Sequence, residues 1–126
     1  TLSKHLFFNP DVDLVYGDCL QTDNENEEFN NNTSNGTIYE HSISQFSKQN
    51  MIKCLPGPMP LWRKSMNEKA GLFNTDHDFA DDWEMWLRAI DNGSKFKKIA
   101  RSLFYKYKHI FGAQVATNFE PYFAQF

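Results

Sequence analysis

The stretch DDWEMWLRAIDNG, residues 81–93, decides the fold, because the spacing of its apolar side chains predicts a buried helix. The apolar positions fall at i, i+3, i+4 and i+7, which is one face of a helical period. They are Trp83, Trp86, Leu87 and Ile90. Asn92-Gly93 is a common signal for the C-terminal end of a helix. We therefore expect a helix whose tryptophan face packs on the core.

This expected helix begins with two adjacent carboxylates whose environments differ. With successive residues turned by about 100°, Asp81 falls opposite the apolar stripe, together with Glu84 and Arg88. Glu84 and Arg88 stand in the favourable i, i+4 order for an exposed ion pair. Asp82 instead falls at the edge of the stripe, beside Trp86. We expect Asp81 to face water and Asp82 to border the core.

Two interpretations of these acids stay open on the local sequence. In the first, Asp81 and Asp82 only complement the positive end of the helix dipole, an effect of about 0.3 to 1 kcal/mol. In the second, Asp82 is a general base, ionised at the mouth of a cleft and held by a rigid helix that its tryptophans anchor. The choice between these two interpretations depends on the other segments of the chain.

Length and charge limit the classes of protein that the chain can represent. Its 126 residues, with a formal net charge of −3, allow one domain with a real core. The cations gather in KFKKIARSLFYKYK (95–108), where they alternate with apolar residues as on the solvent face of a strand. We therefore expect no nucleic-acid binding, and a small anionic molecule is the favoured ligand.

Other features bear on location. No apolar run approaches the roughly 20 residues needed to cross a bilayer, so we expect no membrane segment. Cys19 and Cys54 lack metal-ligand spacing and suggest a reducing compartment, hence a cytoplasmic protein. The opening TLSKHLFFNP (1–10) reads as the end of a helix without a start signal. We interpret the chain as part of a longer protein, which would carry any membrane attachment.

The remaining elements follow from local patterns. Residues 12–18 favour a strand that ends at Gly17-Asp18, and the almost wholly polar residues 21–37 predict a flexible surface loop. The proline-rich segment 51–65 predicts a rigid, extended loop. A short helix is expected next, with Ser65 as N-cap, Glu68 completing a capping box, and Gly71 as its stop. With a strand at 95–108, this order indicates a mixed α/β fold with helices packed against a sheet.

Three segments together resemble a known family. They are NPDVDLVYGD (9–18), GPMPLWRKSMNEKAGLFN (57–74) and DDWEMWLRAIDNGSKFKKI (81–99). In order and spacing they are similar to the family 2 nucleotide-sugar glycosyltransferases of the GT-A fold, over roughly residues 5–108. In that family an acidic pair opens a helix of the form D-W-x-x-W-L-R, and the pair here is Asp81-Asp82. Asp81 stands where the family has Glu, but the family's base corresponds to the second acid, Asp82.

The resemblance implies a fold and an activity. The fold would be a partial GT-A-like mixed sheet with packed helices, residues 1–126 forming a single partial domain that lacks the N-terminal nucleotide-binding half. The activity of the full-length protein would be inverting transfer of a sugar from a nucleotide-sugar donor to a hydroxyl of a saccharide, lipid-linked or protein acceptor. A divalent metal, Mn or Mg, would be bound mainly outside this fragment, and the fragment alone would be inactive.

The same resemblance, combined with local chemistry, gives the candidate site. Asp82 is the expected catalytic base, and the expected substrate-binding residues are Pro58, Arg63, Asp81, Trp83 and Trp86. The tryptophans could stack on a sugar ring or simply form core. Arg63 could bind a diphosphate or could be an ordinary surface residue. His109 is a candidate near the metal or diphosphate, although a lone histidine is more often incidental.

A rival hypothesis belongs to a different class of protein. The chain contains 12 Phe and 3 Trp, which would also suit a non-catalytic, aromatic-rich module that binds carbohydrate or another protein. A nucleotide-binding half encoded upstream would favour the enzyme.

Overall fold

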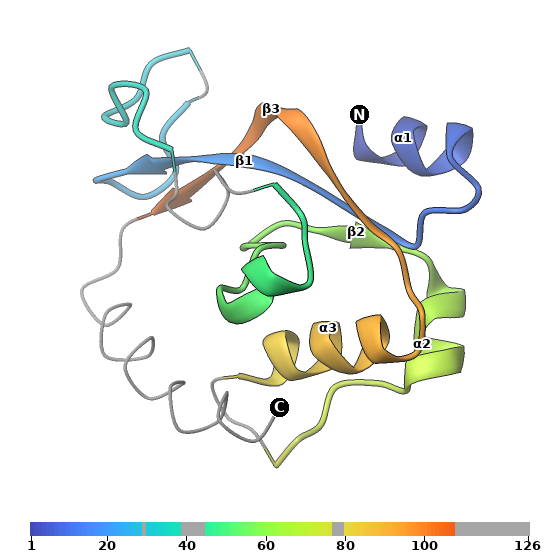
Figure 1. The fold of residues 1–126 in the computed structure, drawn as a ribbon. Coiled ribbons are helices and arrows are strands. Elements are labelled where there is room, and N and C mark those ends of the chain that lie inside the picture. The colour runs from blue at the N-terminus through green and yellow to red at the C-terminus, as the bar shows by residue number, and fades with distance from the viewer. Residues whose placement is uncertain (29, 39–44, 77–79, 108–126) are drawn as a thin grey trace.

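The chain folds as a small α/β unit. The computed structural model describes residues 1–28, 30–38, 45–76 and 80–107, with side chains up to residue 99. Its elements, in chain order, are α1 (Leu2–Phe8), β1 (Leu14–Thr22), the 3-10 helix η2 (Gln49–Ile52), β2 (Leu61–Trp62), α2 (Lys64–Ala70), α3 (Asp81–Asp91) and β3 (Phe96–Tyr107), as Figure 1 shows. In the described sheet the strand order is β2-β1-β3, with β2 antiparallel and β3 parallel to β1. The expected mixed sheet with packed helices is confirmed.

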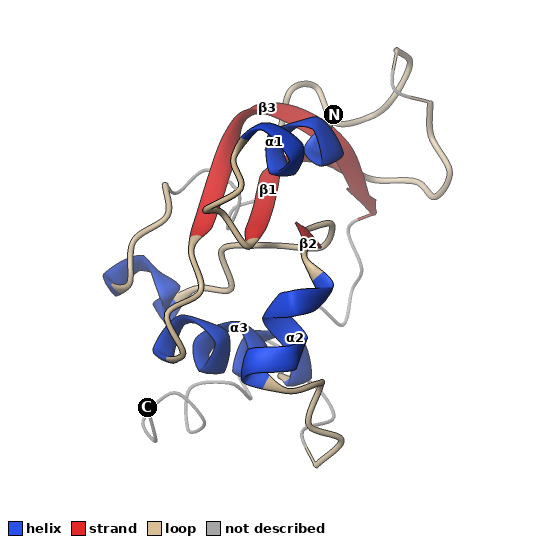
Figure 2. Cartoon of the chain, turned by 90° about the vertical axis from the view of Figure 1, so that its right-hand side faces the viewer, coloured by secondary structure: helices blue, strands red, loops and turns tan. Residues whose placement is uncertain are grey.

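Helices cover both faces of this sheet. Figure 2 shows α1 on one side of the strands and α2 with α3 on the other. The α1 face buries a small cluster formed by Leu2, Leu6, Val12, Val15 and Ile99. The opposite face buries a larger cluster that joins Leu14, Tyr16 and Phe96 of the sheet to Met66 of α2 and to Trp83, Met85, Trp86, Ala89 and Ile90 of α3. The tryptophan face of α3 therefore packs on the core, as its periodicity predicts.

The burial of α3 is wider than its apolar stripe alone indicates. Glu84, expected in water, is only 7% exposed. Its ion pair with Arg88 does form, at 2.7 Å, but the Arg88 guanidinium also donates to the carbonyls of Ala70 and Leu72. The expectation of an exposed pair is wrong, because the chain that leaves α2 packs over this side of α3 and draws both charges into the contact.

Two predicted boundaries also need correction. β1 continues past Asp18 to Thr22, because β3 pairs with it as far as Thr22 opposite Tyr107, across irregularities in register between Gly17 and Cys19. The helix α2 begins at Lys64 with Arg63 as N-cap and without a side-chain cap bond, so the capping box expected from Ser65 does not form. Its stop is confirmed, since Gly71 follows the last turn with φ 88°.

The polar loop after β1 is organised by hydrogen bonds among its described residues. The backbone N–H of Gln21 donates to the Thr37 carbonyl at 2.8 Å and closes the base of the loop. Farther out, the Thr33 hydroxyl donates to Glu27 Oε2 at 2.6 Å, and this hydrogen bond is the main cause that lowers the pKa of Glu27. The flexibility of residues 21–37 stays a prediction.

Candidate active site

Asp82 lies in the first turn of α3, where a loop from another part of the chain meets the helix. Its Oδ1 accepts the backbone N–H of Trp83 at 2.7 Å, and its Oδ2 accepts the Cys54 thiol at 3.8 Å. The Trp83 indole N–H donates to the Met51 carbonyl at 3.0 Å, inside the core. Figure 1 shows the start of α3 below η2 and the loop that follows it. The carboxylate is therefore fixed between a buried helix and the proline-rich loop.

Burial shapes the electrostatics of this carboxylate. Desolvation by burial is the largest influence and raises the pKa of Asp82, while the hydrogen bond from the Trp83 N–H lowers it in part and the neighbouring charge of Asp81 raises it. A carboxyl group with a raised pKa holds a proton more strongly than an ordinary aspartate does. It is thus a better proton acceptor in a reaction near neutral pH, provided that it stays ionised there.

Asp81 makes a different set of contacts from its neighbour. Its Oδ1 accepts the backbone N–H of Asp82 at 2.9 Å, which satisfies one of the free donors at the start of the helix. Asp81 is half-buried rather than fully turned to water. Among the described residues, the hydrogen bond of Asp81 is local to the turn, whereas Asp82 reaches a segment 28 positions away at Cys54. The two acids therefore differ in their contacts, but the expected exposure of Asp81 is not found, because both residues are half-buried.

The two tryptophans of α3 are core residues. Trp83 is 6% exposed and Trp86 2%. Trp86 lies edge-on to three other rings, with centroid distances of 4.9 Å to Trp62, 6.3 Å to Phe73 and 6.2 Å to Phe96. Of the two roles that the sequence left open, sugar stacking or core, burial favours core. Their contribution to the site is to fix the helix that carries Asp82.

Arg63 is tied to the backbone around α1. Its Nε donates to the Val12 carbonyl at 2.8 Å, and its Nη2 donates to the carbonyls of Leu6 and Asn9. An arginine on the last carbonyls of a helix acts as a C-terminal cap. In Figure 1 the junction of β2 and α2 lies toward the C-terminal end of α3, whereas Asp82 opens its N-terminal turn. These contacts give Arg63 a structural role, and nothing in them brings it to Asp82.

The other expected residues are spread more widely. Pro58 is exposed on the loop that carries Cys54, so an acceptor could reach it. His109 lies outside the described residues. Within the described ranges no three His, Cys, Asp or Glu side chains gather in a way that could hold a metal ion.

One residue near Asp82 escaped the sequence interpretation. Cys54 reads as an ordinary buried cysteine, yet it is half-buried and donates its thiol hydrogen to Asp82. The two residues are separated by 28 positions, and no spacing pattern links them. The Gly57 N–H donates to the Cys54 carbonyl at 3.1 Å and closes a turn. This turn brings the Cys54 thiol to the helix.

Comparison with known proteins adds no relative. Neither the family models, nor the curated proteins, nor the solved structures contain a match to this chain. The part of the chain that the structure describes also contains no helix with the length and apolar character that a membrane crossing requires. Function therefore has to be inferred from the residues around Asp82.

Proposed function

We propose that the chain is the acceptor-side part of an inverting glycosyltransferase in which Asp82 is the general base. The observation that supports this most is the half-buried Asp82 carboxylate, with a pKa raised by burial, held at the N-terminus of a rigid helix. A residue that only complemented the helix dipole would have no need of burial or of a contact with a distant loop. The motif resemblance around Asp81-Asp82 names the same residue.

In this reaction Asp82 removes the proton from an acceptor hydroxyl. The hydroxyl oxygen attacks the anomeric carbon of the donor sugar, and the bond from that carbon to the diphosphate breaks on the opposite face. The proton ends on an Asp82 oxygen, and the electron pair leaves with the nucleotide diphosphate, so the configuration at the carbon is inverted. Cys54 and the Trp83 N–H orient the two carboxylate oxygens before the acceptor arrives.

The remaining parts of the proposal concern components beyond the described residues. The donor would be a nucleotide-sugar, the acceptor a saccharide, a lipid-linked molecule or a protein, and the compartment the cytoplasm. The donor and the divalent metal would be held by a nucleotide-binding half in the parent protein. The rival binding module depends on accessible aromatic faces, and the burial of Trp83 and Trp86 removes two of its best candidates.

Two preparations test this proposal. The 126-residue chain alone should show no turnover of nucleotide-sugars and no calorimetric signal with UDP and manganese at submillimolar concentrations, because the proposal assigns the donor pocket to a separate nucleotide-binding half. The parent protein, screened against a panel of nucleotide-sugars, should turn over at least one of them. Metal-dependent UDP binding by the chain alone, or a parent protein that uses no nucleotide-sugar, would contradict it.

A further inference from the structure

An open pocket lies at the end of α3 opposite to Asp82, where the chain turns into β3. Its volume is about 500 Å³, within the range of small-molecule sites. The residues that line it are Val12, Phe46, Lys48, Ile90, Gly93, Ser94, Lys95, Phe96 and Lys97. Since α3 has 11 residues, this pocket and Asp82 are separated by roughly 15 Å along the helix axis. It is a different site from the candidate active site.

One wall of the pocket is apolar and well supported. The rings of Phe46 and Phe96 pack with their centroids 5.5 Å apart. Phe96 packs in turn on Trp86, and Ile90 and Val12 are 7% and 8% exposed, so this wall rests on both core clusters. A rigid apolar surface of this kind favours an aromatic or aliphatic ring in the ligand.

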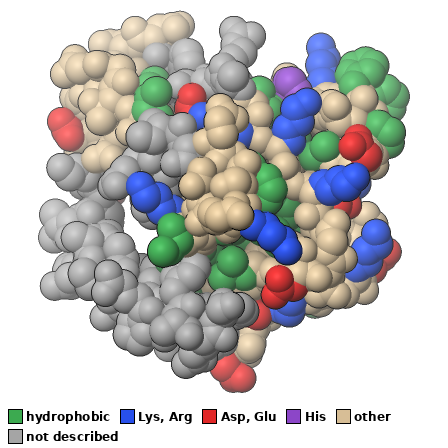
Figure 3. Space-filling view, in the orientation of Figure 1, with side chains coloured by type: hydrophobic (Ala, Val, Ile, Leu, Met, Phe, Trp, Pro, Cys, Tyr) green, Lys and Arg blue, Asp and Glu red, His purple; other side chains and the backbone are tan. Residues whose placement is uncertain are grey.

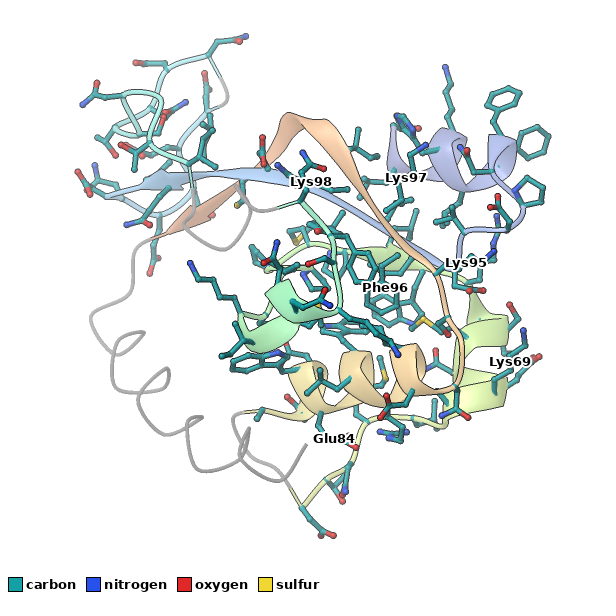
Figure 4. All side chains as sticks on the ribbon, viewed as in Figure 1. Lys69, Glu84, Lys95, Phe96, Lys97 and Lys98 are labelled. Atoms are coloured by element: carbon teal, nitrogen blue, oxygen red, sulfur yellow. The ribbon has the colours of Figure 1, made fainter. Side chains whose placement is uncertain are left out.

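The other feature of the pocket is a group of three lysine side chains. Lys48, Lys95 and Lys97 are exposed, and none forms an ion pair with another described residue. Lys98 differs, because its Nζ lies 2.8 Å from Asp18 Oδ1 in a nearly buried pair. Figure 4 shows Lys95, Phe96 and Lys97 in succession at the start of β3, and Figure 3 shows Lys and Arg side chains beside hydrophobic ones in the middle of this face.

The carbonyls at the end of α3 and the carboxylate of Asp13 lie near the pocket and have hydrogen-bond donors of their own. A helix C-terminus repels anions through its free carbonyls. Here the Gly93 and Ser94 N–H groups donate to the carbonyls of Ile90 and Ala89, at 2.9 and 3.0 Å, and so close the last turn. The carboxylate of Asp13 accepts the backbone N–H of Lys95 at 2.8 Å. Among the residues that line the pocket, the charged side chains are three lysines and no carboxylate, which favours an anionic ligand.

Ser94 provides an independent observation. It lines the pocket and is 9% exposed, and its hydroxyl has no hydrogen-bond partner among the described residues. A buried hydroxyl without a hydrogen-bond partner is unfavourable, so a ligand group that accepts a hydrogen bond from it would be favoured. An anionic oxygen is a strong acceptor for such a hydroxyl.

We propose that this pocket binds a small organic anion, a phosphate or carboxylate carried on an aromatic or apolar ring. The ring packs on Phe46 and Phe96, the anionic group lies among Lys48, Lys95 and Lys97, and one of its oxygens accepts the Ser94 hydroxyl. The alternative is that lysines at the edge of a sheet only prevent pairing with other strands. That alternative requires no ligand.

Titration of the chain by NMR or calorimetry tests the pocket without any assay of transferase activity. The probes are phenyl phosphate and benzoate, with inorganic phosphate and phenol as controls that carry the charge or the ring alone. At low salt, phenyl phosphate or benzoate should bind at least tenfold more tightly than either control, and added salt should weaken the binding. Shifts should centre on residues 93–97.

Substitutions in the pocket test where the ligand binds, and a substitution outside the pocket is the control. The double substitution Lys95→Gln with Lys97→Gln should weaken binding at least tenfold, and Ser94→Ala should weaken it without unfolding the chain. Lys69→Gln changes an exposed lysine on α2, outside the pocket, and should leave affinity unchanged (Figure 4). Equal affinity for ring, phosphate and the combined probe, or equal losses in all three variants, would overturn the proposal and leave the lysines as edge protection. Failure here leaves the transferase proposal intact, since that depends on Asp82.

Discussion

Asp82 carries a charge that its surroundings oppose. Burial raises its pKa, and the N–H of Trp83 only partly offsets that effect. If the Asp82 carboxylate served to stabilise the fold, we would expect surroundings that favour its ionised form. A carboxylate whose ionisation is disfavoured fits the proposed role of a general base, because a raised pKa strengthens it as a proton acceptor.

This electrostatic cost gives a prediction for Asp82→Asn in the 126-residue chain. The folded pKa lies above the unfolded one, so between the two values the native state binds more protons and stability falls as pH rises. Near pH 7 the variant avoids that cost, and its melting temperature should equal or exceed that of the wild type. Near pH 3, where the wild-type carboxyl is protonated in both states, the difference should disappear.

Thermal melts at both pH values measure this, with Asp81→Asn as the matched control. Both substitutions remove one charge from the same helix terminus, so their dipole effects nearly cancel in the comparison. A variant Asp82→Asn that melts well below Asp81→Asn at neutral pH would mean that its carboxylate serves to cap the helix.

At the scale of elements, α3 is fixed to the sheet by the aromatic group around Trp86. Its ring contacts three others, and its indole N–H is buried without a partner among the described residues. Trp86→Ala should cost about 3 to 5 kcal/mol in denaturant titration, because it opens a large cavity. Trp86→Phe keeps most of the packing and removes the unpaired donor, so its cost should be clearly smaller. A loss below about 1 kcal/mol for the alanine variant would mean that this face of α3 is not core.

A second contact between elements depends on Arg88. It joins Glu84 on its own helix to the carbonyls of Ala70, the last residue of α2, and of Leu72. An added Cβ at Gly71 would meet the Arg88 Nη1 at 2.8 Å. Arg88→Ala should destabilise the chain by roughly 2 to 4 kcal/mol, because it removes the guanidinium that pairs with the nearly buried Glu84 carboxylate. Adding Glu84→Gln should recover part of that loss. A double variant no more stable than Arg88→Ala alone would show that the carbonyl contacts, and not the ion pair, are the main contribution.

These elements also show what the sequence could and could not predict. The period of Trp83, Trp86 and Ile90 is local information, and it gave the helix and its buried face correctly. The burial of Glu84 depends on where α2 packs, which no local pattern specifies. β1 extends to Thr22 because its partner strand comes much later in the chain, and Cys54 reaches Asp82 only through tertiary folding.

In the whole molecule, the two ends of α3 lie in different chemical environments. Its first turn holds Asp82 against the proline-rich loop, and its last turn borders the lysine-lined pocket. The order of strands and helices in the sequence was enough to predict a mixed α/β fold, because a sheet with an apolar face needs helices to cover it. The proposed reaction rests on Asp82 and on the family resemblance around it.

The most direct measurement of that central claim compares the turnover of Asp82→Asn and Asp81→Asn in the parent protein. Asp82→Asn should lower the steady-state rate by roughly 10²- to 10⁴-fold, as the loss of a general base does, while donor binding and melting temperature stay near the wild-type values. Asp81→Asn should lose far less, because within the described part of the chain its carboxylate bonds to the backbone of its own turn. Equal losses in the two variants, or a structural collapse confined to Asp82→Asn, would contradict the account and return both acids to the role of stabilising the helix terminus.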